Sequence, residues 1–232
     1  MISSLQAVIF DFDGVIANSE PLHLRAFQLT LAGIGAELTP AEYFAQYLGF
    51  DDVGMFQAFG NNRGLPLTDE DVRRLVQQKG VHLRRLTGGD GVLFPGAKEF
   101  VRTVAAAVPV AIASGALRHE IDEVLDGAGL APLFPVIVAA GDTPQSKPSP
   151  APYDLAFRRL AAISPHPLAR NRCVAIEDSR WGLESARGAG LRCVAVTNSY
   201  PAHELGEADL TAGGLDKLTL ETLDRLCADG RS

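Results

Sequence analysis

Short apolar runs, separated by longer stretches of helical periodicity, constrain the fold of this chain more than any other feature. The runs are apolar nearly throughout, which is typical of parallel strands that helices cover on both faces. Alternation of such strands with helices predicts an α/β fold built on a doubly wound parallel sheet. The expected strands are 5–10, 108–113, 136–139, 173–176 and 193–196, and the expected helices between them are 97–106, 119–126, 153–161 and 183–188.

One long interval interrupts this alternation. Between about residues 18 and 91 the sequence has helical stretches, such as 22–31 and 69–86, and no convincing strand. Thr68 and the acids that follow it are typical of a helix start, and residues 88–91 are expected to form a flexible glycine-rich exit. We therefore expect a core domain interrupted by an α-helical cap domain, with the core formed by 1–17 and 92–232 and the cap by 18–91.

Composition excludes several classes of protein. The 232 residues are 47% hydrophobic and 21% charged, as in a globular protein with one large domain and a small insert. No apolar run has transmembrane length and no basic leader begins the chain, so we expect a cytoplasmic protein with no membrane partner. The formal charge of −7 and the absence of a Lys/Arg cluster argue against nucleic acid as a partner. Three cysteines without metal-ligand spacing imply no disulfide framework. We expect the protein to be a monomer or a weak dimer.

Two carboxylates directly follow the first expected strand. Asp11 and Asp13 lie in the segment Asp11-Phe12-Asp13-Gly14, and side chains two residues apart in an extended chain point the same way. The two acids are therefore expected to converge, and like charges held close need a proton or a cation between them. Taken alone, the pair would also fit an ordinary turn with solvated acids.

Polar residues of catalytic type follow three further strands. Ser114 follows the second expected strand, Lys147 comes soon after the third, and Glu177 and Asp178 follow the fourth. Because the carboxyl ends of parallel strands meet at one edge of a sheet, we expect these residues at a single site. Acids, a hydroxyl and a lysine suit phosphoryl transfer to a carboxylate nucleophile with Mg²⁺ as cofactor. The glycine-rich fingerprints of dinucleotide-binding proteins and of P-loop proteins are both absent.

Taken in order, these segments resemble the motifs of the haloacid dehalogenase-like (HAD) superfamily. Phe10–Val15 looks like its first motif, Ser114 its second, Lys147 its third and Glu177-Asp178 its fourth. The resemblance is to the phosphatase and β-phosphoglucomutase-like branch with a helical cap, and it covers the chain from about residue 7 to 197. It implies a Rossmann-like (flavodoxin-like) core and a Mg²⁺-dependent phosphomonoester hydrolase that acts on a small phosphorylated substrate.

The resemblance also implies roles for individual residues. Asp11 would be the nucleophile that becomes an aspartyl-phosphate, and Asp13 the acid that protonates the leaving alcohol and then the base that activates water. Ser114, Gly115 and the backbone N–H groups of their loop would hold the phosphoryl oxygens, and Lys147 would offset charge in the transition state.

The same resemblance implies the metal ligands. Mg²⁺ would bind Asp11, the carbonyl oxygen of Asp13 and Asp178, with Glu177 either a direct ligand or one step behind. Taken singly, Ser114 and the acids after the fourth strand also fit ordinary helix caps, and Lys147 fits a solvated loop lysine. Their order along the chain favours the catalytic interpretation.

Residues of the expected cap and of the loop after Ser114 bear on the substrate. His23 and Lys79 look like the pair that, in β-phosphoglucomutase, helps couple cap closure to the acid/base aspartate. Glu20 opens the cap in the segment that ends with His23 and is also expected to contact the substrate. Asp52 falls where that enzyme grips a second phosphate with an arginine, which argues against a bisphosphate. Arg118 provides positive charge after the second motif, either for the substrate or for the protein surface.

The preferred interpretation is a phosphatase of a sugar phosphate or similar phosphomonoester. A β-phosphoglucomutase-like phosphosugar mutase is the first alternative. A catalytically idle binding module is the second, disfavoured because no motif residue is lost. A receiver-like phosphoacceptor domain would be much shorter, and a dehalogenase would need neither Asp13 nor a metal.

Overall fold

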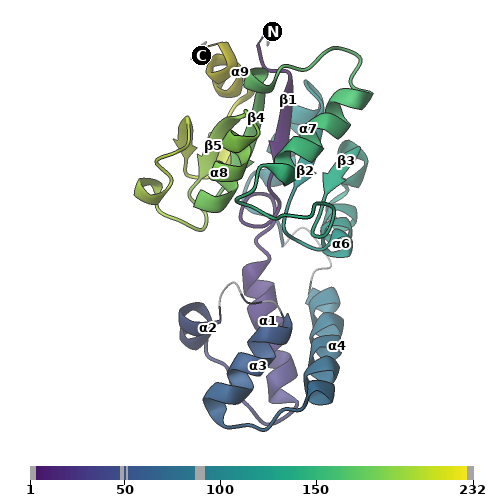
Figure 1. Ribbon diagram of the computed structural model, residues 1–232, viewed down its shortest axis with the longest axis vertical. Helices are drawn as coiled ribbons and strands as arrows, with labels where there is room; N and C mark the ends of the chain where they lie inside the picture. Colours follow the sequence, from purple (N-terminus) through teal and green to yellow (C-terminus); the bar gives the residue numbers. More distant parts are fainter. Residues whose placement is uncertain (1–3, 48–49, 51, 87–91, 229–232) are drawn as a thin grey trace. The chain divides into compact units, whose positions relative to one another are not determined.

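The computed structural model describes residues 4–47, 50, 52–86 and 92–228. The chain forms two compact units (Figure 1). Met1–Asn18 and Gly89–Ser232 make one, here called the sheet unit, and Ser19–Gly88 makes the other, the helical unit. Among the described residues, no helix combines the length and the apolar character needed to cross a membrane.

A six-stranded parallel sheet organises the sheet unit. Its order is β3-β2-β1-β4-β5-β6, which is the strand order of the Rossmann fold. The predicted Rossmann-like parallel sheet is therefore confirmed, although the order is not the 2-1-3-4-5 arrangement of flavodoxin. The strands are β1 (Ala7–Phe10), β2 (Val110–Ala113), β3 (Val136–Val138), β4 (Cys173–Glu177), β5 (Arg192–Val196) and β6 (Leu210–Ala212).

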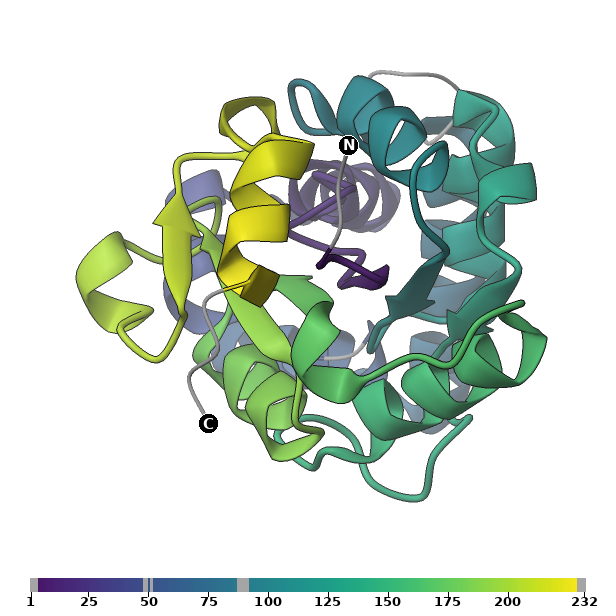
Figure 2. The ribbon, with the colours of Figure 1, turned by 90° about the horizontal axis from the view of Figure 1, so that it is seen from above.

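Helices cover both faces of this sheet, so its central strands are apolar on both sides. One face packs against Tyr153 and Leu160 of α7 and Leu183 of α8, while Phe10 on the other face meets Phe100 of α5 edge-on at 6.3 Å between ring centroids. Figure 2 shows α7 and α8 (green) on one side of the strands and α9 (yellow) on the other. The helices are α5 (Ala97–Ala105), α6 (Arg118–Ala128), α7 (Ala151–Ile163), α8 (Arg180–Gly188) and α9 (Leu220–Ala228), with 3₁₀ turns at Ala131–Leu133, Arg170–Arg172, Ala202–Glu204 and Leu215–Lys217.

The helical unit has an apolar core of its own. Phe27 and Phe56 pack edge-to-face at 5.3 Å between ring centroids, and Tyr43, Met55 and Leu75 are buried around them. Its described residues form no strand, and the predicted flexible exit at 88–91 lies outside the described residues. The helices are α1 (Glu20–Ala32), α2 (Pro40–Gln46), α3 (Asp52–Arg63) and α4 (Asp69–Leu86).

Candidate active site

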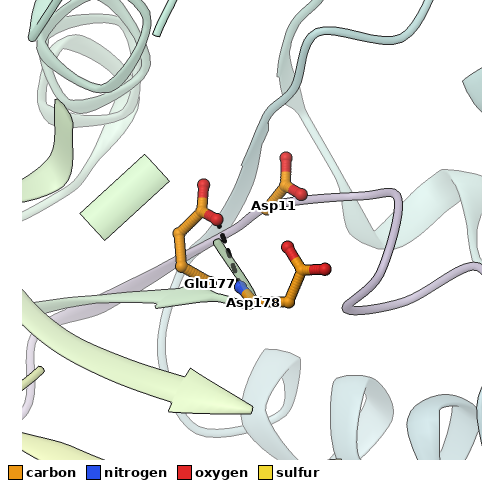
Figure 3. Close-up of side chains that lie close together, drawn as sticks. All are labelled: Asp11, Glu177 and Asp178. Carbon is orange, nitrogen blue, oxygen red and sulfur yellow. Dashed lines mark hydrogen bonds between the residues drawn. The ribbon is translucent and has the colours of Figure 1, made fainter. Parts of the chain in front are cut away.

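Three buried carboxylates gather at the carboxyl ends of two central strands. Asp11 directly follows β1, Glu177 ends β4, and Asp178 comes next. Phe10 lies opposite Ile176 in the parallel pairing of these strands, so the residues that follow them emerge side by side. One carboxylate oxygen from each acid lies within 4.8 Å of the others, and Figure 3 shows the three side chains around a common space.

Burial and mutual repulsion make this cluster electrostatically costly. Burial raises the pKa of the Asp11 carboxyl well above its ordinary range against the attraction of Lys147, and Glu177 and Asp178 raise it further. Burial, followed by the charge of Glu177, raises the pKa of Asp178 to about 7. A divalent cation with oxygen preference would relieve this repulsion. The donor set therefore fits Mg²⁺.

Lys147 supplies the positive charge within the cluster. Its Nζ lies 2.6 Å from Asp11 Oδ1 and 2.6 Å from Glu177 Oε1. Burial alone would lower the pKa of Lys147, but the two carboxylates outweigh it and raise the pKa above its ordinary value. Lys147 is thus a partly buried, charged partner of Asp11 and not a solvated loop lysine.

Glu177 accepts hydrogen bonds on both carboxylate oxygens. Oε1 accepts from Lys147 and, at 2.8 Å, from the hydroxyl of Tyr153. Oε2 accepts from the backbone N–H of Asp178 and from the hydroxyl of Ser179, each at 3.1 Å. A Cβ on Gly182, in the first turn of α8, would overlap this carboxylate. The glycine therefore allows Glu177 to lie against the start of the helix.

Asp178 is held by contacts with the turn after β1 and the loop after β5. Gly14 has a φ of 78° and a Cβ there would overlap the Asp178 carboxylate, so both conformation and space require glycine. Ser199 donates a hydrogen bond from Oγ to Asp178 Oδ2. Asn198 Nδ2 donates to the carbonyl oxygen of Gly14 at 2.7 Å, which ties the two loops together.

The loops that carry Asp13 and Ser114 are also ordered by local hydrogen bonds. Asp13 is half-buried and forms an isolated β-bridge with Ala17; the expected convergence of its side chain with Asp11 stays a prediction. Ser114 is buried, and its Oγ accepts from the backbone N–H of Ala116 at 3.0 Å. The N-cap of α6 is Leu117, so Ser114 is not a helix cap.

Three further residues were expected to contact the substrate; that role stays a prediction, and the structure shows their surroundings. Gly115 is exposed, and a Cβ on it would meet nothing within 4 Å. Arg118 is paired along α6 with Asp122, whose two carboxylate oxygens each lie 2.9 Å from Arg118 Nε. In the helical unit, Glu20 Oε1 accepts from the hydroxyl of Tyr43 at 2.5 Å.

His23 and Lys79 meet inside the helical unit. Lys79 is 1% exposed, and its Nζ lies 2.9 Å from His23 Nδ1 and 2.8 Å from Asp52 Oδ1. The ring of Phe27 lies beneath it at 4.9 Å. Burial, and then the charge of Lys79, lowers the pKa of His23 to about 4, so at neutral pH the uncharged ring accepts from the lysine. Asp52 neutralises Lys79 within this cluster.

Several residues that order the site were not predicted from the sequence. Asn198 and Ser199 follow β5, and the rule that found the other motifs, polar residues after a strand, would have found them. Gly182 has no signal in the sequence, because only the position of Glu177 excludes a side chain there. Tyr153 lies within an apolar helical pattern and looks like an ordinary core residue.

Residues 5–190 match the haloacid dehalogenase-like hydrolase family, and the chain belongs to this family, as predicted. It is similar to protein CbbY of Cereibacter sphaeroides, with 31% identity over 209 residues that cover 86% of this chain and 87% of CbbY. It is also similar to the chloroplastic 5-amino-6-(5-phospho-D-ribitylamino)uracil phosphatase of Arabidopsis thaliana. The identity there is 28% over 219 residues, which cover 94% of this chain and 57% of that protein.

Solved structures agree with this assignment. The fold is similar to that of a mutant CbbY from Rhodobacter sphaeroides in complex with xylulose-(1,5)bisphosphate, with a TM-score of 0.77, 28% identity and coverage of 95% of this chain and 99% of that one. It also shares its fold with β-phosphoglucomutase from Clostridium difficile, at a TM-score of 0.74, 20% identity and coverage of 97% and 98%. The protein is therefore a hydrolase of the haloacid dehalogenase-like family.

Proposed function

We propose that this protein is a Mg²⁺-dependent phosphatase that hydrolyses a small phosphorylated metabolite, such as a sugar phosphate, through an aspartyl-phosphate on Asp11. The observation that carries the proposal is the position of Asp11, buried at the carboxyl edge of the sheet, 2.6 Å from the ammonium of Lys147 and beside two further carboxylates. The phosphatase and the bisphosphate complex among the similar proteins support the choice of substrate class. In this proposal the sheet unit is the catalytic domain and the helical unit the inserted cap domain.

The first half of the reaction transfers the phosphoryl group to the protein. An oxygen of the Asp11 carboxylate attacks phosphorus, and the bond from phosphorus to the ester oxygen breaks. Asp13 gives its proton to that oxygen, so the product leaves as a neutral alcohol. Ser114 and the backbone N–H groups around Gly115 hold the phosphoryl oxygens, while Lys147 offsets their charge.

The second half returns the protein to its starting state. Asp13, now a carboxylate, takes a proton from a water molecule that attacks phosphorus, and the bond to Asp11 breaks to release inorganic phosphate. Asp11, Glu177 and Asp178 are the carboxylates that would hold Mg²⁺, together with the carbonyl oxygen of Asp13. Bound there, the ion would neutralise charge on the transferring phosphoryl group.

Phosphate release from glucose 1-phosphate, phosphoglycolate and hexose 6-phosphates tests this function. We expect release that requires Mg²⁺, stops with EDTA, and falls at least about 10³-fold in Asp11→Asn. Asp126→Asn is the matched control, because it makes the same change at an exposed position of α6 and should leave release unchanged.

Three results would contradict the proposal. Release by Asp11→Asn at the wild-type rate would exclude Asp11 as nucleophile. Conversion of glucose 1-phosphate to glucose 6-phosphate, primed by the bisphosphate and without net release, would make the protein a mutase. Neither activity on a broad panel of phosphomonoesters would favour a binding module.

A further inference from the structure

Tyr153 contacts both charged groups that adjoin the Asp11 nucleophile. It lies on α7, fully buried, with its hydroxyl 2.8 Å from Glu177 Oε1. Its ring centroid lies 5.1 Å from Lys147 Nζ. A single side chain thus touches the carboxylate with its polar end and the ammonium with its aromatic face.

The hydroxyl of Tyr153 acts as a hydrogen-bond donor to the glutamate. Burial, followed by the nearby charges of Glu177 and Asp11, raises the pKa of this phenol well above its ordinary value, so the proton stays on the oxygen. A buried tyrosine hydroxyl needs a polar partner, and a carboxylate oxygen is the stronger kind of acceptor.

Glu177 Oε1 is the point at which this contact affects the active site. That oxygen accepts from Tyr153 and from Lys147, which in turn donates to Asp11 Oδ1. Without the hydroxyl, Oε1 would keep only Lys147 as its donor. The Glu177 carboxylate could then rotate while Oε2 keeps its hydrogen bonds to Asp178 N–H and Ser179 Oγ. Lys147 would then follow Glu177 away from Asp11.

We infer that Tyr153 is a positioning residue, which fixes the Glu177 carboxylate and through it the Lys147 ammonium against Asp11. The inference rests on the proposed function, because it gives Tyr153 its effect through the nucleophile and the candidate Mg²⁺ ligands. Packing alone would require an aromatic ring at this place but no hydroxyl, so removal of the oxygen separates the two roles.

The test is Tyr153→Phe, which keeps the ring and removes the donor. Two quantities are measured: Mg²⁺ binding to the substrate-free protein by isothermal titration, and kcat and KM for phosphate release. We expect Mg²⁺ affinity and kcat each to fall about 10-fold or more, as when outer hydrogen-bond partners of metal ligands are removed, with KM within about twofold.

Tyr47→Phe is the matched control. Tyr47 is 1% exposed, lies in the helical unit, and its hydroxyl accepts from Asn62 at 3.2 Å, so the same atom is removed from an equally buried ring. Its Mg²⁺ affinity should equal that of the wild type. Circular dichroism and the Tm of each variant verify that both remain folded.

The inference would be overturned if folded Tyr153→Phe bound Mg²⁺ as tightly as Tyr47→Phe does. It would also be overturned if the kcat of Tyr153→Phe equalled that of the wild type. A wild type that binds Mg²⁺ but releases no phosphate would instead contradict the proposed function, while the titration still measures the effect of Tyr153. Absence of Mg²⁺ binding by the wild type would overturn both.

Discussion

A methyl group at position 182 would occupy the space that the Glu177 carboxylate fills. Glycine is otherwise a poor choice inside a helix, because it costs about 0.5–1 kcal/mol relative to alanine. Its presence in the first turn of α8 is therefore explained by the site and not by the helix. The same reasoning applies to Gly14, where a positive φ adds a second requirement.

Gly182→Ala should displace Glu177 and with it Lys147. We expect kcat for phosphate release to fall about 10-fold or more, and stability to fall by about 1–3 kcal/mol from overpacking. Phosphate release and urea unfolding measure the two effects. Gly80→Ala is the control, since its Cβ would meet Arg84 Nη1 at an ordinary 3.6 Å. That change should stabilise the protein by about 0.5–1 kcal/mol, and equal effects of the two changes would exclude the steric explanation.

At the scale of elements, a polar cluster around the buried Lys79 joins three helices of the helical unit. His23 on α1, Asp52 at the start of α3 and Lys79 on α4 meet through two hydrogen bonds. Because Lys79 itself is buried, removing one of its partners would leave its ammonium with one acceptor fewer. The uncharged state of His23 belongs to this arrangement, because a second positive charge beside Lys79 would be repelled.

Acid should therefore loosen the helical unit. The pKa of His23 is about 4 in the folded state and 6.5 ordinarily, so between these values the unfolded state binds more protons. The contribution of His23 to the free energy of unfolding is therefore fully present above about pH 6.5. It is lost as the pH drops toward 4, which lowers the free energy of unfolding by up to about 3 kcal/mol. Hydrogen exchange of the helical unit from pH 7 to pH 4 measures the loss. His23→Gln should remove this part of the pH dependence and the exposed control His119→Gln should not; identical profiles for all three proteins would contradict the assignment.

The elements differ in how well the sequence predicted them. Five strands were predicted because they are buried and apolar, whereas β6 is short and partly exposed and carries no such signal. Of the helical unit, α1 and α4 were predicted, but α2 and α3 were not resolved as separate helices. Thr39 is the N-cap of α2, and its Oγ1 accepts a hydrogen bond from the backbone N–H of Glu42. A threonine followed three residues later by a glutamate is a recognisable helix start, so the start of α2 could have been predicted from the sequence.

The residues of the site also differ in how well the sequence predicted them. Asp11, Lys147, Glu177 and Asp178 lie together because the ends of parallel strands share an edge, a rule that needs only the order of motifs. Tyr153 reaches the site from a helix on the face of the sheet. Contacts of that kind depend on how a helix packs, which periodicity does not specify.

At the scale of the whole molecule, the helical unit and the sheet unit have apolar cores of their own. Phe56→Ala should create a cavity in the first of these and destabilise it by about 3–5 kcal/mol. We expect faster hydrogen exchange across 19–88 with protection retained in β1, β2 and β4, because local opening follows local stability. Mass-spectrometric hydrogen exchange measures both regions at once. Equal loss of protection in both would show a single cooperative unit.

The interrupted course of the sheet unit also affects its synthesis. β1 is a central strand, and its neighbours β2 and β4 are encoded after the helical unit. The residues that contact Asp11 are synthesised much later than Asp11 itself. Lys147 follows it by 136 residues, and at the usual rate of translation this delay lasts roughly 7 to 30 s. During that time a nascent chain carries Asp11 on an apolar segment with no sheet to join, while the contiguous helical unit can already fold. Premature termination anywhere before Asp178 would leave a product without the complete carboxylate cluster and with a strand exposed to aggregation.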